Sequence, residues 1–134
     1  MFKRMKYLYL LLVFILPACS IVGMDSANGK REYDKCKSID QCLTYIERTI
    51  SKNWKAPKHS TKHQSAVIRF ILNPDGTLQQ AVLSESSGNL DYDKSGFDAL
   101  TKSAPFKEIA RFNIDAYNEN FKKLRFVFSR YNEK

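Results

Sequence analysis

The 134-residue sequence is poor in the residues that most often form reactive centres. It has only two histidines and three cysteines. It contains no GxSxG nucleophile elbow, no HExxH zinc motif and no P-loop, and no cysteine stands with a histidine in a catalytic signature. Asp91 and Asp93 lie two apart, but we expect Asp91 in a turn and Asp93 as a helix cap. We therefore expect no enzymatic activity and no cofactor.

The two histidines also give little support to a metal site. His59 and His63 are four residues apart in the polar stretch from Pro57 to Gln64. No apolar periodicity supports a helix there, and neither a third ligand nor a nearby carboxylate is present. The sequence therefore predicts no bound metal.

A long hydrophobic run is missing as well. The apolar stretch from Tyr7 to Ala18 has about a dozen residues, whereas a membrane-spanning helix needs roughly 20. It follows a basic start with Lys3, Arg4 and Lys6, which is typical of a secretory signal. We therefore predict that residues 1–18 are a signal peptide.

The end of this run, LPACS, resembles the lipobox of bacterial lipoproteins, with Leu16 at −3, Ala18 at −1 and Cys19 at +1. The resemblance implies a lipid on Cys19 that attaches the protein to a membrane. Ser20 follows in place of the Asp that favours inner-membrane retention, so the resemblance implies the periplasmic face of the outer membrane. Ordinary secretion and an amphipathic start to a cytosolic domain remain alternatives.

The net charge is positive but moderate. It is +8 for the whole chain and falls to +5 when Lys3, Arg4 and Lys6 leave with the signal peptide. Such a charge aids solubility and mildly favours acidic partners or anionic surfaces. Because the implied location is the periplasm, we expect no nucleic acid among the partners. The length of the chain indicates one small domain.

Two cysteines remain after Cys19. Cys36 and Cys42 are close in sequence, and in an oxidising compartment such a pair predicts a disulfide, although two packed thiols remain possible. The spacing is not CxxC, so a redox-active pair is disfavoured. Residues 20–35 are mostly small, polar or charged, and apolar residues do not recur among them at any regular spacing. We therefore interpret 19–35 as the lipidated cysteine with a flexible tether. The folded domain is then 36–134.

Periodicity predicts the elements of that domain. Ser38 and Gln41 form a capping-box pattern before a helix that ends near Trp54. Ala66 to Leu72 reads as a strand, Asn73 to Gly76 as a hairpin turn, and 77–86 as the partner strand with a bulge near Gln79 or Gln80.

The second half is less regular. Asp93 is expected to cap a second helix that turns Phe97 and Leu100 inward and stops before Pro105. A long polar loop is expected next. In the last element, Phe121 to Ser129, apolar and polar residues alternate, which predicts an amphipathic strand.

The order helix, strand, strand, helix, strand predicts a small two-layer α+β domain. Short connections allow the final strand to lie beside the first. The result would be a three-stranded antiparallel sheet with both helices on one face.

Two segments carry a family resemblance. The first, residues 73–106, is similar to the TonB/TolA C-terminal domain signature and has the sequence NPDGTLQQAVLSESSGNLDYDKSGFDALTKSAPF. YIERTISKNWKAP, residues 45–57, resembles the first helix of the TolA-like branch. The resemblance spans roughly Ile39 to Phe128 and implies a domain that binds envelope proteins of the periplasm or outer membrane. Family members couple the two membranes through a spanning helix and a long arm; this chain shows neither, so we expect no energy transduction.

The resemblance also implies where partners bind. If the strands lie side by side in the order second, first, third, numbered along the chain, the final strand is at an edge of the sheet. An edge strand can pair with an added strand. The matching positions are Phe121, Lys122, Lys123, Leu124, Arg125, Phe126 and Val127. The cations Lys122, Lys123 and Arg125 are either gatekeepers against aggregation or selectors for an acidic partner. An immunity or inhibitor lipoprotein, acting as a decoy against a bacteriocin, phage or lytic enzyme, is the alternative function.

Overall fold

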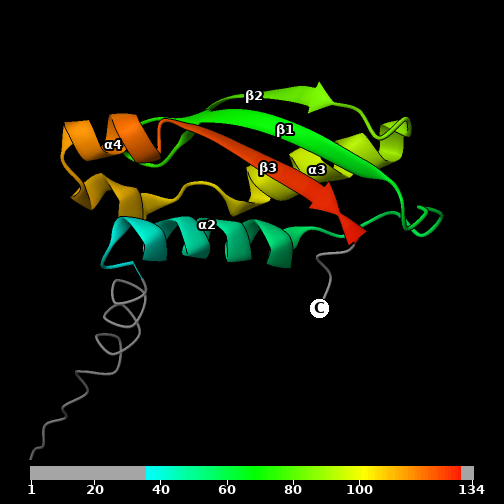
Figure 1. Cartoon of the computed structure of the whole chain (residues 1–134), viewed down its shortest axis with the longest axis horizontal. Coiled ribbons are helices and arrows are strands. Elements are labelled where there is room, and N and C mark those ends of the chain that lie inside the picture. The colour runs from blue at the N-terminus through cyan, green and yellow to red at the C-terminus, as the bar shows by residue number, and fades with distance from the viewer. Residues whose placement is uncertain (1–35, 131–134) are drawn as a thin grey trace, which may run out of the picture. The chain divides into compact units, whose positions relative to one another are not determined.

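The computed structural model describes residues 36–130 (Figure 1). The predicted signal peptide, Cys19 and the tether lie outside the described residues. The elements are α2 (Ile39–Asn53), β1 (Ser65–Leu72), β2 (Leu78–Glu85), α3 (Leu90–Ser103), the 3-10 helix η2 (Lys107–Arg111), α4 (Ile114–Asn120) and β3 (Lys123–Ser129). None of the helices in this part of the chain is long and apolar enough to cross a membrane.

The start of α2 is fixed by hydrogen bonds and a disulfide. The Ser38 hydroxyl accepts a hydrogen bond from the Gln41 N–H at 3.3 Å, and the Gln41 side chain in turn accepts one from the Lys37 N–H at 2.9 Å. A disulfide joins Cys36 to Cys42, as predicted. Arg111 also donates a hydrogen bond to the Cys36 carbonyl. The first turn of the helix is therefore held to the rest of the domain.

The sheet has the predicted order, β2-β1-β3, with both pairings antiparallel. In the β1–β2 pair, Ile71 lies opposite Gln80 and Leu72 opposite Leu78, so Gln79 is the extra residue of a bulge. This confirms the predicted bulge. A second register shift, between Val67 and Ile68, was not predicted.

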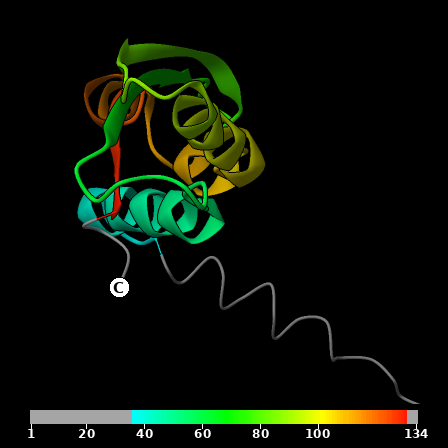
Figure 2. The same cartoon turned by 90° about the vertical axis from the view of Figure 1, so that its right-hand side faces the viewer.

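The helices α2 and α3 lie on one side of the sheet and leave its other face open (Figures 1 and 2). Trp54, at the end of α2, packs edge-on against Tyr92 of α3 at 5.7 Å and against Phe128 of β3 at 5.5 Å between ring centroids. Its indole N–H donates to the Ser95 hydroxyl at 3.0 Å. Leu100 is fully buried as expected, and Phe97 packs partly buried against the core. These contacts join both helices to the sheet.

Asp93 does not cap α3, contrary to the prediction. The helix begins at Leu90, and the cap is Asn89, whose side chain accepts a hydrogen bond from the Tyr92 N–H at 3.2 Å. Asp93 lies in the first turn, is 5% exposed, and accepts hydrogen bonds from the Ser86 hydroxyl (2.5 Å) and the Ser87 N–H (2.8 Å). Asp93 therefore ties the first turn of α3 to the residues that follow β2.

Burial of the Asp93 carboxyl acts to raise its pKa, but the hydrogen bonds from Ser86 and Ser87 together outweigh it. The pKa therefore lies below its ordinary value. The ionised form is the one that this connection stabilises.

The predicted polar loop after Pro105 is also wrong, because it contains η2 and α4. Asn113 caps α4 by accepting a hydrogen bond from the Ala116 N–H at 2.9 Å. Buried Tyr117 donates its hydroxyl proton to the Leu72 carbonyl at 2.6 Å, and its pKa is raised by burial and, to a smaller extent, by the charge of Asp75. A helix of seven residues is too short to show periodicity, but its anchoring side chain is buried.

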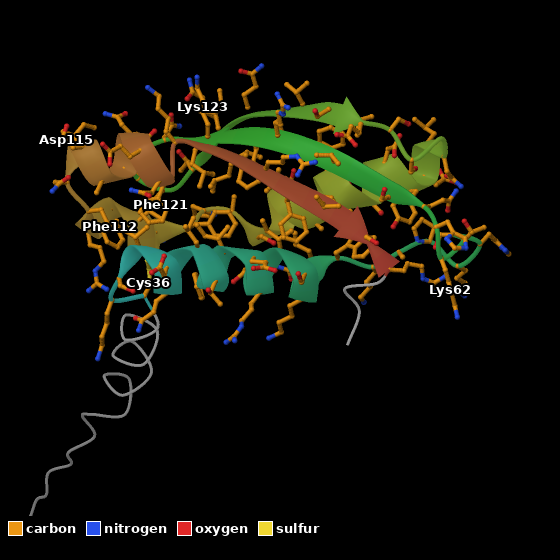
Figure 3. All side chains as sticks on the ribbon, in the orientation of Figure 1. Cys36, Lys62, Phe112, Asp115, Phe121 and Lys123 are labelled. Carbon is orange, nitrogen blue, oxygen red and sulfur yellow. A yellow bond between two sulfur atoms is a disulfide. The ribbon has the colours of Figure 1, made fainter. Side chains whose placement is uncertain are left out.

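The final strand begins two residues later than predicted. Phe121 caps the C-terminus of α4, is fully buried and packs against Phe112 at 5.0 Å between ring centroids. Figure 3 shows both rings turned inward, whereas Lys123 points away from the core. The side chain of Phe121 therefore belongs to the core, not to the surface of the strand.

Candidate functional site

The sheet has two edge strands, and they differ in regularity. The pairing of β2 with β1 is interrupted by two register shifts. The pairing of β3 with β1 runs without a shift from Ser129 opposite Ser65 to Lys123 opposite Ile71. Bulges disrupt the ladder and twist an edge away from further pairing. The edge that offers a regular template is therefore β3.

The register decides which backbone groups of β3 point outward. The Leu72 N–H donates to the Lys122 carbonyl at 3.1 Å, so Leu72 and Lys122 form a hydrogen-bonded pair. Hydrogen-bonded positions alternate in an antiparallel pair, so Leu124, Phe126 and Phe128 bond to β1. The N–H and C=O groups that point to the open edge are those of Lys123, Arg125 and Val127.

The side chains of β3 divide in the same alternating way. Leu124 and Phe126 are half-buried on the helix side, and Phe128 is fully buried. Lys123 and Arg125 are exposed on the open face of the sheet. Lys122 lies before the strand, and its N–H donates to the Tyr117 carbonyl at 3.0 Å, so it offers no donor to a partner.

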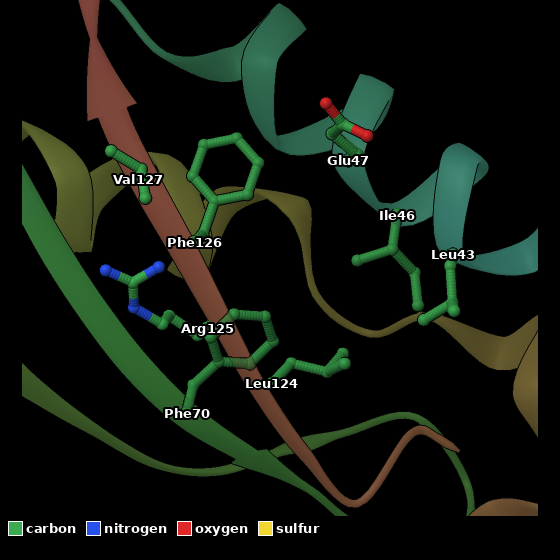
Figure 4. A pocket seen from close by; sticks show the side chains of 8 residues that line it. All are labelled: Leu43, Ile46, Glu47, Phe70, Leu124, Arg125, Phe126 and Val127. Carbon is green, nitrogen blue, oxygen red and sulfur yellow. The ribbon is translucent and has the colours of Figure 1, made fainter.

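A groove of about 310 Å³ runs between β3 and α2. Figure 4 shows Leu43 and Ile46 of α2 facing Leu124 and Phe126 of β3 across it, while Arg125 and Val127 point to the other side of the strand. Its lining residues are Leu43, Ile46, Glu47, Phe70, Leu124, Arg125, Phe126 and Val127. The groove was not predicted, because its walls come from opposite ends of the described chain.

The open face beside β3 carries positive charge. Arg125 lies directly opposite Arg69 of β1, and its guanidinium is 3.6 Å from the carboxylate of Glu85 on β2. The side chains of this ion pair are 53% and 65% exposed, so the pair contributes well under about 1 kcal/mol of stability. The electrostatic feature available to a partner is therefore cationic.

The remaining predicted positions lie away from this edge or outside the described chain. His59 and His63 are exposed in the segment between α2 and β1, and no group of three metal-ligating side chains occurs within residues 36–130. Cys36 and Cys42 are fully buried at the start of α2. The predicted absence of a metal and the lipid on Cys19 stay predictions.

Comparison with known proteins agrees with this architecture. The sequence model of the family described as TonB C terminal matches residues 39–112. The Tol-Pal system protein TolA of Pseudomonas aeruginosa is 23% identical over 91 residues, which are 68% of this chain but only 25% of the relative. A solution structure of TolAIII bound to a peptide derived from the N-terminus of TolB superposes with a TM-score of 0.57 at 24% identity, covering 63% of this chain and 68% of that one.

The fold and the matched segment define the class of protein. The domain is a small α+β unit with a three-stranded antiparallel sheet, similar in fold to TolAIII. Because the family match covers more than half of the chain, the protein belongs to the TonB C-terminal family.

Proposed function

We propose that this protein is a protein-interaction module of the cell envelope that binds its partners by adding their strands to the β3 edge. The observation that carries the proposal is the unbroken register of β3, which points the backbone groups of Lys123, Arg125 and Val127 away from β1, whereas the pairing of β2 is interrupted by bulges. The TolAIII structure, of the same fold, contains a bound peptide, which supports a peptide-binding role.

The proposed setting follows from the N-terminal sequence. A signal peptide of residues 1–18 and a lipid on Cys19 would hold the domain at the periplasmic face of the outer membrane, through the flexible tether of residues 20–35. Sixteen flexible residues span roughly 20–25 Å on average and about 55 Å when fully extended, so the domain would remain close to the membrane. In this setting it recruits envelope proteins without catalysis and without transducing energy.

The test removes one outward donor. Lys123→Pro deletes an N–H that faces the open edge, and proline is tolerated at the first residue of a strand. Partner proteins crosslinked to the wild-type protein in intact envelopes should be captured several-fold less well, while the circular dichroism spectrum stays unchanged.

Lys122→Pro is the matched control. Its N–H is bound internally by the Tyr117 carbonyl, so this substitution should lower the melting temperature by removing a helix-end hydrogen bond. If a folded Lys123→Pro protein captures every partner as efficiently as wild type, the edge of β3 is not the binding site.

A further inference from the structure

An added strand would present two different environments to its side chains. Strand side chains alternate between the two faces of a sheet. Beside β3, every second side chain of a partner would lie on the face of Leu124 and Phe126, and the others would lie on the face of Lys123 and Arg125. The chemistry of these two faces therefore predicts the partner's sequence pattern.

The helix-side face is the groove between α2 and β3. Leu43 and Ile46 form one wall, and Phe70, Leu124 and Phe126 form the opposite side (Figure 4). Its volume of about 310 Å³ lies near the lower end of small-molecule pockets, roughly 300–1,000 Å³, which suits individual side chains. Aliphatic side chains that enter it would bury apolar surface on both partners.

The open face is cationic and poorly compensated. Arg69 and Arg125 are direct cross-strand neighbours, an arrangement of like charges that is destabilising, and Lys123 extends the cluster along β3. Glu85 pairs with Arg125, but among the described residues no carboxylate forms an ion pair with Arg69 or Lys123. Acidic side chains on an added strand would supply the missing countercharges.

We infer that the partner segment alternates apolar and acidic residues, with its apolar side chains in the groove between α2 and β3 and its acidic side chains beside Lys123 and Arg125. The inference rests on the proposed strand addition and specifies its ligand. It also assigns a role to the cations of this edge, because they select a partner in addition to discouraging aggregation.

The test uses three synthetic peptides of the seven-residue length of β3, each with a fluorescent label. One alternates glutamate with valine, the second lysine with valine, and the third glutamate with serine. Binding is measured by fluorescence anisotropy to the full chain, purified in detergent because of its apolar N-terminal run. The glutamate–valine peptide should bind at least about tenfold more tightly than either other peptide, and added salt should reduce its advantage over the lysine peptide.

Two variants assign the preference to residues of this chain. Lys123→Glu should weaken binding of the glutamate–valine peptide several-fold, whereas Lys102→Glu on α3, an equal charge change at an exposed site outside the groove, should not. Leu43→Ala should weaken it several-fold, whereas Val82→Ala, at a 50% exposed apolar position on β2, should not.

The outcomes separate the inference from the proposed function. Equal binding of all three peptides that is lost in Lys123→Pro would overturn the alternating pattern and leave strand addition standing. Peptide binding that is unaffected by Lys123→Pro would contradict both. Absence of binding by the glutamate–valine peptide would also overturn the inference, while the crosslinking experiment would still test the edge.

Discussion

The carbonyl oxygen of Gly76 accepts a hydrogen bond from the backbone N–H of Phe106 at 2.9 Å. This bond joins the tip of the β1–β2 hairpin to the segment that follows α3. Gly76 has a φ of +86°, and a Cβ placed on it would overlap the carbonyl group of Phe106. The turn at Asp75 and Gly76 and the segment from Ala104 to Phe106 are far apart in the sequence. They are therefore in direct backbone contact in the fold.

This contact predicts a large effect for Gly76→Ala. The added methyl group faces a backbone carbonyl that cannot move aside like a flexible side chain, and positive φ is itself unfavourable for alanine. We expect a loss of roughly 3 kcal/mol or more in the free energy of unfolding, measured by urea denaturation.

Gly88→Ala is the control for that prediction. Gly88 has a similar φ of +83°, but nothing lies within 4 Å of its added Cβ. Only the backbone strain remains, so the loss should be about 1 kcal/mol. Equal losses in the two variants would show that the contact with Phe106 is unimportant.

Asp93 should make stability depend on pH. Its pKa in the folded state is lowered, so the stabilisation is fully present above its unfolded pKa of about 3.9 and is lost as the pH falls through the folded value. Asp93→Asn should cost about 2 kcal/mol at neutral pH and should flatten the loss of stability below about pH 4. Denaturation curves across pH 2 to 7 would measure both effects.

Asp91→Asn provides the comparison for Asp93. Asp91 is exposed in the same first turn of α3. Its removal should change the free energy of unfolding at neutral pH by less than about 0.5 kcal/mol. A wild-type pH profile in Asp93→Asn would show that the buried carboxylate does not govern acid sensitivity.

The disulfide between Cys36 and Cys42 should resist alkylation in the native protein. After reduction and unfolding, both thiols should react, which mass spectrometry would detect. A Cys36→Ala and Cys42→Ala double variant should lose roughly 2 kcal/mol of unfolding free energy, because a short covalent loop no longer restricts the unfolded chain. Two freely alkylated thiols in native periplasmic material would contradict the bridge.

The proposed lipid anchor is tested at Cys19. Cys19→Ser should abolish labelling by a palmitate analogue in growing cells and should move the protein from the membrane to the soluble periplasmic fraction. The Cys36→Ala and Cys42→Ala double variant controls for loss of cysteine as such and should remain labelled. Unchanged labelling of Cys19→Ser would rule out the lipoprotein proposal.

Local sequence determined most of the secondary structure. Apolar residues at helical spacing, including Cys42, Ile46 and Ile50, predicted α2, since each turn must present the same face to the core. Pro74 and Gly76 predicted the hairpin, because few other residues adopt the required backbone angles. The sheet order followed from these elements and short connections, and the structure confirms it.

The errors had two causes: a choice between two equally good helix caps, and a helix too short to be recognised. Asn89 and Asp93 can both cap a helix, and the position of Ser86 and Ser87 decides that Asp93 is used elsewhere. Helix α4 has too few residues for a periodic pattern. Its stability comes from the burial of Tyr117 and of Phe121 at its end, which the neighbouring sequence does not reveal.

Only the tertiary structure decided which edge of the sheet is regular and which backbone groups of β3 point away from β1. The sequence indicated an amphipathic final strand but could not tell whether Lys122 or Lys123 presents its N–H to solvent, because the direction of a backbone group depends on the register with β1. The groove likewise exists only when α2 is packed beside β3. Alternation along a strand is a local property and can be read from the residues, whereas a surface made by two distant segments arises only from their packing.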